Sequence, residues 1–385
     1  MKKQKRCLPD DVIQIIMSKL PVKTLMRCKC LSKEWNSVIN TTDFISSHLL
    51  HSSTSKLSII EGINLISGLP KLLLLRNETT VQDLELPLFA RDNIQKIHDL
   101  RTRIVVGSCN GLICFNLSDN YTTILLWNPA TRESRYLPEP MLMFTKQRFP
   151  YQLSFGFDHF NNDYKLVRVT QKSTLELGVQ IFKQSTNYWR GVKGISGYRM
   201  TRSEPMIVNG VLYLLAGHDK KNEVNLCILR FNLCHEEFQK VLDLPSKTKN
   251  IMFTKWKESF AVAEQKDLEC NFWIMNDGLL GWTKLFKING CFACDNKSYF
   301  LGTWKDQVLF IKHSKHDREL EAHDRELEYE YDTEELEYER ELTILDAIHG
   351  DYMNNHRKIK KHGIMNRYFY TFDYMESLVS VNPDS

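Results

Sequence analysis

The feature that most constrains the fold is a pattern that recurs along the chain: an apolar strand-like run, a polar turn, and a second such run. Its first copy begins at Ile124 and passes through the turn-like stretch 128–132, Asn-Pro-Ala-Thr-Arg. Further copies begin at Val179, Ile228 and Phe272, so neighbouring copies lie 44 to 55 residues apart. This period is typical of a four-stranded propeller blade or a similar repeating β unit. Beyond residue 55 we therefore predict a mostly β domain.

Two later stretches complete the expected set of units. Residues 368–380 form a late copy, which leaves room for one more unit near residue 320. There, residues 316–322 are followed at once by the nearly identical 323–329. From Leu327 the apolar residues alternate, which predicts a hairpin over 327–342, with a wholly helical acidic insertion as the alternative. We expect about six units, with the duplication at 316–341 inserted into the sixth.

The first 52 residues have a helical pattern instead. Pro9 and two aspartates suit a helix start, Pro21 ends that helix and begins another, and Ser32 suits the N-cap of a third. Three short helices make a very small core, so a module of this size usually needs a partner. We interpret the surplus apolar side chains as a docking surface, made of Leu8, Pro9, Leu20, Pro21, Leu25 and Trp35.

The segment from Leu8 to Ser47 resembles the F-box. The resemblance rests on the Leu-Pro pairs at 8–9 and 20–21 and on the stretch 27–35, which reads Arg-Cys-Lys-Cys-Leu-Ser-Lys-Glu-Trp. It implies an all-α F-box over 1–52 that docks on a Skp-type adaptor, and through it on a cullin. The alternative is an ordinary three-helix cap on the domain that follows.

The β part resembles the F-box-associated, kelch-like domain of plant F-box proteins, including S-locus F-box and F-box/kelch-repeat proteins. The matching pieces are 107–114, 127–132, 155–158 with 163–167, 208–213 and 374–379. The resemblance implies a β-propeller-like substrate-recognition domain over 56–385. The chain departs from the family's pattern at 317–341, and the double-glycine motifs of true kelch repeats are absent.

Few residue groups suggest chemistry. Asn110-Gly111 predicts a hairpin turn rather than a phosphate loop. Asp158-His159 and His218-Asp219 contain acid and base types, but they lie in loop-like sequence without a nucleophile motif, so we expect solvated side chains. The spacing of one set of residues would suit a zinc site, namely Cys291, Cys294, His313 and His316. We prefer the interpretation that the two cysteines are thiols in an apolar core and that the two histidines only border the duplicated sequence. We expect no catalytic residue, no metal and no cofactor.

Composition and charge narrow the class of protein further. No apolar run approaches the roughly 18 residues of a membrane span, and ten scattered cysteines without a secretory signal predict reduced thiols. Residues 1–52 carry a charge of +5 and residues 317–341 a charge of −10. The basic residues come without a nucleic-acid-binding motif, so we expect no nucleic-acid partner. We expect a cytoplasmic protein, also nuclear if the basic residues 2–6 act as an import patch rather than a solvated tail.

These observations predict a non-catalytic substrate receptor of an SCF-type (Skp–cullin–F-box) ubiquitin ligase. The β domain then holds a protein substrate, with Tyr329, Tyr331 and Tyr338 as candidate contacts. The acidic stretch favours a basic partner, and the S-RNases of self-incompatibility, which are often basic, fit that description. A scaffold that binds the adaptor without delivering substrates is one alternative, and a propeller enzyme is another.

Overall fold

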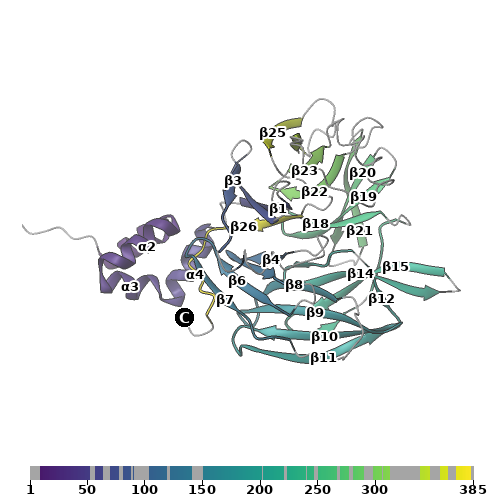
Figure 1. Cartoon of the computed structure of the whole chain (residues 1–385), viewed down its shortest axis with the longest axis horizontal. Helices are drawn as coiled ribbons and strands as arrows, with labels where there is room; N and C mark the ends of the chain where they lie inside the picture. The colour runs from purple at the N-terminus through teal and green to yellow at the C-terminus, as the bar shows by residue number, and fades with distance from the viewer. Residues whose placement is uncertain are drawn as a thin grey trace, which may run out of the picture.

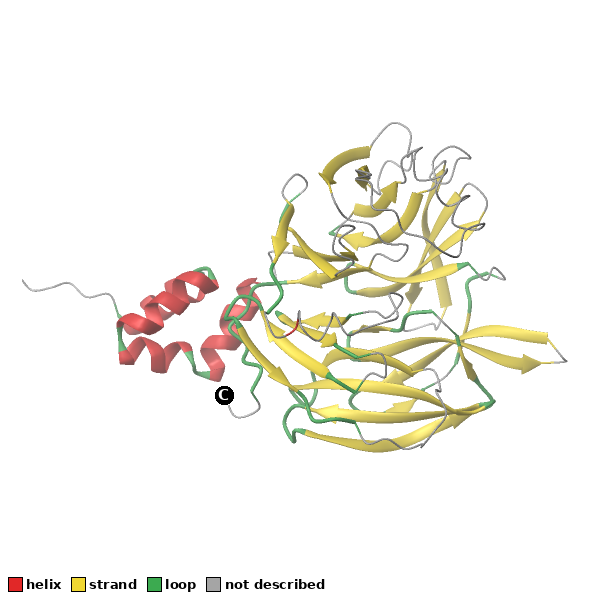
Figure 2. Ribbon diagram, in the orientation of Figure 1, coloured by secondary structure: helices red, strands yellow, loops and turns green. Residues whose placement is uncertain are grey.

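The chain consists of four helices followed by a β domain (Figures 1 and 2). The computed structural model describes residues 9–52, 57–63, 70–77, 81–87, 90, 104–118, 122–140, 151–201, 203–220, 223–239, 241–246, 250–266, 269–276, 281–289, 298–305, 307–312, 339–346, 356–362 and 370–382. The helices stand together at one side of the β domain, next to β7 and β26. None of the described helices is long and apolar enough to cross a membrane.

The helices begin where the sequence places polar or fixed-φ residues. Prolines precede α1 (Asp10–Ser18) and α2 (Val22–Leu31), and the Ser32 hydroxyl accepts backbone N–H bonds at the start of α3 (Lys33–Ile39). The expectation of only three helices is wrong, because α4 (Thr42–Ser52) follows. The Thr41 hydroxyl accepts the N–H of Phe44 at 3.3 Å. The polar interruption at 40–42 therefore caps a helix instead of ending the module.

The described β residues form six antiparallel sheets. Sheet 1 contains β26 (Tyr370–Tyr374), β1 (Leu57–Ile63), β2 (Pro70–Leu75) and β3 (Val81–Leu84). Sheet 2 contains β4 (Val105–Cys109), β5 (Leu112–Asn116), β6 (Ile124–Asn128) and β7 (Glu133–Tyr136). Sheet 3 contains β8 (Tyr151–Asp158), β9 (Asp163–Ser173), β10 (Glu176–Lys183) and β11 (Tyr188–Ser196).

Sheet 4 is built from longer central strands with short edge strands. It contains β12 (Arg199–Met200), β13 (Met206–Val208), β14 (Val211–Lys220), β15 (Glu223–Asn232), β16 (Glu237–Phe238) and β17 (Leu242–Asp243). Sheet 5 contains β18 (Ile251–Trp256), β19 (Ser259–Lys266), β20 (Glu269–Asn276) and β21 (Gly281–Asn289). Sheet 6 contains β22 (Ser298–Trp304), β23 (Gln307–Lys312), β24 (Glu339–Asp346) and β25 (His356–His362).

The six sheets form a closed ring. One strand of each sheet contacts the next in the order β26, β4, β8, β13, β18, β22 and back to β26. The ring closes within sheet 1, where the last strand, β26, pairs with β1. Apolar clusters fill the space between successive sheets from sheet 1 to sheet 6. This arrangement confirms the predicted propeller-like domain of about six units.

The repeat found in the sequence marks the third strand of sheets 2 to 5, namely β6, β10, β15 and β20. The late copy at 368–380 was misassigned, because β26 is the innermost strand of sheet 1 rather than the third strand of a separate unit. The other strands of sheet 1, within residues 57–84, do not carry the repeat, so the sequence pattern did not predict them as a unit. The expected number of units is right because these two errors compensate.

The predicted hairpin over 327–342 falls mostly outside the described residues, which include only 339–342 of it. Leu342 pairs with Ile311 on one side and with Ile359 on the other. Residues 339–342 therefore begin a central strand, β24, which has β23 and β25 as its neighbours. The duplicated residues 316–329 fall in the connection between β23 and β24 and lie outside the described residues.

The connections differ between the two ends of the ring. One end, here the turn end, carries short turns that need left-handed residues, such as Asn110-Gly111 with φ of 50° and 83° and Asn209-Gly210 with φ of 49° and 73°. This confirms the predicted turn at 110–111. The opposite end, here the loop end, receives longer connections, including the one between Lys312 and Glu339.

A buried carboxylate joins sheet 1 to sheet 2. Glu61 is 5% exposed and accepts backbone N–H bonds from Ile104 at 2.9 Å and Val105 at 3.3 Å. We predict that Glu61→Ala leaves these donors unpaired and lowers the free energy of unfolding by about 2 kcal/mol or more. Thermal unfolding of the full chain tests this, with the exposed Glu85→Ala as the matched control. Equal melting temperatures for the two variants would contradict the prediction.

Candidate functional site

The predicted docking residues are not equally accessible. Pro9 and Pro21 are exposed, and Leu20 and Trp35 are half-buried against the helical core. Leu8 lies outside the described residues. The prediction that Leu25 contacts a partner is wrong, because its side chain is 0% exposed and lies inside the helical core. It has no surface to offer a partner, since its stripe on α2 faces the other helices.

An apolar stripe that the sequence analysis did not single out lies on α1. Val12, Ile15 and Ile16 are 38%, 57% and 48% exposed, whereas Ile13 and Met17 face the core. Residues at i, i+3 and i+4 share one helix face, so the three exposed side chains are neighbours. The signal was present, because the apolar arc of α1 is wider than the side that packs on the helical core, while Asp10, Asp11 and Gln14 share the polar face.

The helical core includes two residues from the β domain. Leu378, beyond β26, is 3% exposed and packs with Met17, Val22, Leu25, Ile39 and Phe44. Ala130, in the turn between β6 and β7, packs against the same cluster. The helices therefore do not complete their core alone, as the small size of the module predicted.

The segment that carries Leu378, residues 375–382, is called here the C-terminal strap. The side-chain amide of Asn128 donates to the carbonyls of Ser377 at 3.0 Å and Val379 at 2.7 Å. The Ser377 hydroxyl donates to the Asn110 carbonyl at 2.7 Å. Gly111 is needed beside it, because a Cβ there would overlap the Ser377 side chain. The strap is thus fastened to two turns of sheet 2.

The strap also continues towards sheet 3. The Gln184 side-chain amide donates to the carbonyls of Ser380 at 3.3 Å and Asn382 at 3.4 Å. Val381 is 1% exposed and lies in the apolar cluster between sheets 2 and 3. Figure 1 shows this segment, in yellow, leaving β26 and passing between α4 and β7.

Ionisable groups lie at the contact between helices and β domain. Burial lowers the pKa of Lys29 on α2, and the nearby Glu133 of β7 offsets part of this effect. Burial also lowers the pKa of His48 on α4. The Leu20 carbonyl and Glu376 of the strap partly offset this decrease. The His48 Nε2 atom lies 3.0 Å from the Leu20 carbonyl oxygen, so a neutral ring donates there and links α4 to the end of α1.

Comparison with known proteins assigns both parts. The F-box domain model matches residues 6–47, and the model of the F-box associated beta propeller domain matches residues 74–381. The chain belongs to the F-box proteins with an associated β-propeller. The Arabidopsis thaliana F-box protein At1g11270 is 30% identical over 258 residues, which cover 63% of this chain and 77% of the relative.

Two further relatives of this F-box protein come from Arabidopsis thaliana. F-box protein CPR1 is 27% identical over 73% of each chain. The F-box/kelch-repeat protein At3g23880 is 26% identical over 74% of this chain and 80% of its own. These matches confirm the family that the motifs at 8–35 and 107–379 indicated.

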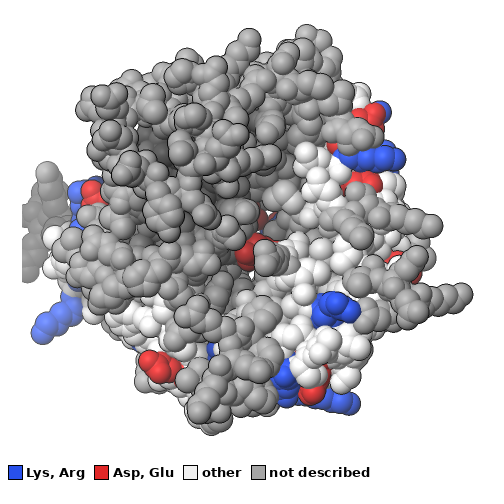
Figure 3. Space-filling model, turned by 45° about the vertical axis from the view of Figure 1, so that its right-hand side comes forward, with Lys and Arg blue, Asp and Glu red and all other residues white. Residues whose placement is uncertain are grey.

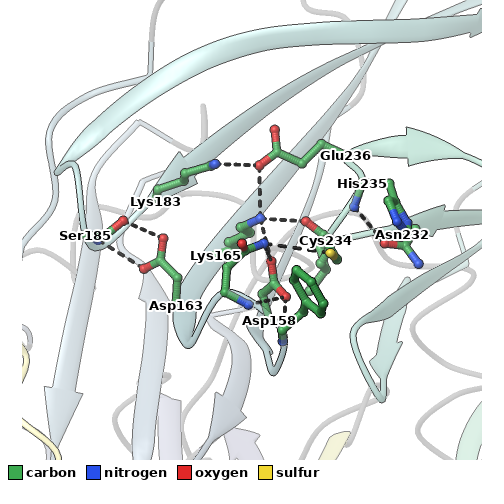
Figure 4. A network of polar contacts seen from close by, with 12 residues as sticks. Asp158, Asp163, Lys165, Lys183, Ser185, Asn232, Cys234, His235 and Glu236 are labelled. Atoms are coloured by element: carbon green, nitrogen blue, oxygen red, sulfur yellow. Dashed lines mark hydrogen bonds and ion pairs between the residues drawn. The ribbon is translucent and has the colours of Figure 1, made fainter.

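In this F-box protein, Asp158 does not have the solvated role that we expected. It is 2% exposed and lies 2.8 Å from the fully buried Lys165 ammonium, which is also 2.9 Å from Glu236 (Figure 4). Burial alone would raise the pKa of Asp158, but the hydrogen bonds from Asn161 and Lys165 and the Lys165 charge lower it to about 2. The group joins sheets 3 and 4 and is a structural ion-pair network.

The network extends to the surface on one side. Glu236, at the turn end of sheet 4, also pairs with Lys183 at 2.8 Å and with Arg190, both from sheet 3. The second acid and base pair considered, His218-Asp219, falls within strand β14 rather than a loop.

Several predicted residues cannot be placed. Tyr329, Tyr331, Tyr338 and the cysteines and histidines considered for zinc at 291–316 lie outside the described residues. Among those that the structure does describe, no group of three or more His, Cys, Asp or Glu side chains is arranged to hold a metal ion. Figure 3 shows the described Lys and Arg side chains of one face standing apart and mixed with Asp and Glu.

We predict that the helical module becomes less stable below pH 6.5. Because the pKa of His48 is lower in the folded protein than its ordinary value of 6.5, the unfolded chain binds the proton more readily. Stability contributed by neutral His48 is present above that value and falls as the pH decreases below it. Hydrogen exchange of α1 and α4 at pH 7.5 and 5.5 measures this.

The matched variants for this experiment are His48→Gln and His51→Gln. Glutamine at 48 does not titrate, so the acid sensitivity of this variant should be smaller than that of the parent. Repulsion from His51 is only one of the smaller causes that lower the pKa of His48, so the His51→Gln variant should keep most of the acid sensitivity. The same acid-induced loss in the His48→Gln variant and the parent would contradict the prediction.

We predict that Lys165→Met lowers the free energy of unfolding by about 3 kcal/mol or more, because it leaves the buried Asp158 without its cation and removes one of the cations of Glu236. Lys183→Met removes a partly exposed partner of Glu236 and should cost about 1 kcal/mol or less. Denaturant unfolding of both variants measures the difference. Equal losses would show that the buried ammonium has no special role.

Proposed function

We propose that this F-box protein is the substrate-recognition subunit of an SCF-type ubiquitin ligase. The observation that carries the proposal is the exposed stripe Val12, Ile15 and Ile16 on a module whose opposite face is already packed. Each large apolar side chain contributes about 1.5–3 kcal/mol when it is buried, so such a stripe favours association. Its partner in this proposal is a Skp-type adaptor, which connects the chain to a cullin.

The adaptor surface then consists of this stripe together with the accessible members of the predicted set, Pro9, Leu20, Pro21 and Trp35. Leu25 supports it from within the core rather than by contact. Arg27 and Lys33 are exposed on the same module and add positive charge.

We infer that the substrate is a protein held at the loop end of the propeller. The helical module packs at the turn end, while the connection between Lys312 and Glu339, the longest between two strands, is at the other end. Loops on a rigid scaffold are the usual carriers of recognition. The stretch 317–341 carries a charge of −10, and all of it except 339–341, at the start of β24, belongs to the connection between β23 and β24. This charge favours a basic partner. In the most specific form of this proposal, the basic substrates are S-RNases.

A receptor of this kind needs no nucleophile of its own. It raises the effective concentration of the bound protein near a conjugating enzyme and makes no bond itself. The cytoplasm, with or without the nucleus, is the compartment in which we propose that it acts. A scaffold that binds the adaptor without delivering a substrate would share the stripe on α1, and the lifetime of captured proteins separates the two functions.

We predict that a double variant, Ile15→Asp with Ile16→Asp, weakens capture of a purified Skp-type adaptor by about tenfold or more, since it places charges in an apolar interface. Its melting temperature should match the parent, because both side chains are exposed. Leu25→Ala should instead lower the melting temperature by emptying a core position. Titration calorimetry and thermal unfolding make the comparison.

The control is Leu285→Asp, an exposed leucine on β21 of the propeller, which should leave adaptor capture unchanged. Failure of the intact protein to capture the adaptor would overturn the proposal. Proteins that accumulate in cells expressing the double variant are candidate substrates, and basic proteins among them would support the charge argument. If none accumulates, the scaffold function is favoured.

A further inference from the structure

Three sequence motifs that the proposed function does not use meet at one place. They are the turn 110–111, the stretch 127–132 and the stretch 374–379, which lie in different parts of the chain. The structure brings Asn110, Asn128, Ala130, Ser377 and Leu378 together beneath the helices, and we call this group the joint.

We propose that the joint fixes the orientation of the F-box on the propeller, and that Leu378 and Asn128 are positioning residues for ubiquitin transfer to the bound protein. The role in ubiquitin transfer rests on the proposed function. The second, non-covalent attachment of the helices to the propeller does not depend on that function.

The propeller side of the joint holds the strap in one register. Asn128 donates two hydrogen bonds to carbonyls that lie two residues apart, Ser377 and Val379. Asn128 is itself 0% exposed, and its Oδ1 atom accepts the N–H of Ala130 at 3.0 Å. Because both ends of this amide are occupied, a shift of the strap by one residue would break its bonds.

The helix side of the joint follows from the contacts of three successive strap residues. Ser377 and Val379 face the propeller, where they contact Asn110 and the cluster between sheets 2 and 3. Leu378, between them, points the other way and enters the helical core. The fixed register on one side places the apolar anchor on the other.

The direct connection between α4 and β1 spans only residues 53–56. One chain crossing leaves two bodies free to rotate about it, whereas a second contact at a distance restricts that rotation. A fixed angle would keep a bound protein at a constant position relative to the adaptor, which raises its effective concentration at the conjugating enzyme.

The test separates the two attachments. A specific protease site is placed at residues 53–56 of the full-length protein and is cleaved after folding. We expect the helices to stay with the propeller on gel filtration in the parent. Leu378→Asp should increase the released helical fragment by about tenfold or more, the factor expected from one buried leucine.

Two further variants keep this test decisive. Ala130→Asp disturbs the same contact from the propeller, so it should release helices whose own sequence is intact. Leu31→Asp makes the same chemical change at an 82% exposed position and should release none. Separation of the helices from the cleaved parent would overturn the inference, and so would their retention in both joint variants.

A second measurement addresses positioning in the uncleaved protein. Resonance energy transfer between dyes introduced by non-canonical amino acids at Ser46 and Lys193, both exposed, reports the angle between the two parts. Leu378→Asp and Asn128→Ala should broaden the distribution of distances while adaptor capture persists. An unchanged distribution would overturn the positioning role. Loss of adaptor capture in the parent itself would instead count against the proposed function and leave the joint intact.

Discussion

The pairing of β26 with β1 is the interaction on which the rest of the architecture depends. It is the step that turns a row of local hairpins into a ring, since it joins residues 57–61 to 370–374. Its register also sets where the chain ends. Leu57, the first strand residue after the helices, pairs with Tyr374, the last residue before the strap. The antiparallel partners therefore deliver the C-terminal strap to the helices.

The sequence predicted well what depends on local pattern. Residues close together in the sequence determine the helix starts at the prolines and at Ser32. The same is true of the turn at 110–111 and of the third strands of sheets 2 to 5. Sheet 1 was missed because its two parts lie at opposite ends of the chain, and its inner strand has no turn of its own to mark it. The capping role of Thr41 was missed because a polar break in an apolar pattern looks the same at the end of a helix and at the beginning of the next.

The candidate site was harder to predict, because its residues gain their meaning from distant partners. Leu25 and Ile15 both belong to apolar helix stripes, yet one is fully buried and the other is 57% exposed. Asp158 resembled a solvated turn residue, but its cation is held in turn by Glu236, which lies in the next sheet. Only the packing of the sheets decides such cases.

The position of the joint separates the two surfaces that a receptor needs. The strap and the helices pack against the turns of sheet 2 at the turn end of the ring, and Gly111 shows how little space remains there. The strands of each sheet span the ring from that end to the loop end, so the proposed substrate site lies a full strand length away from the proposed adaptor surface. Variation in the loops, even an insertion as long as that between Lys312 and Glu339, then leaves the geometry of the helices unchanged.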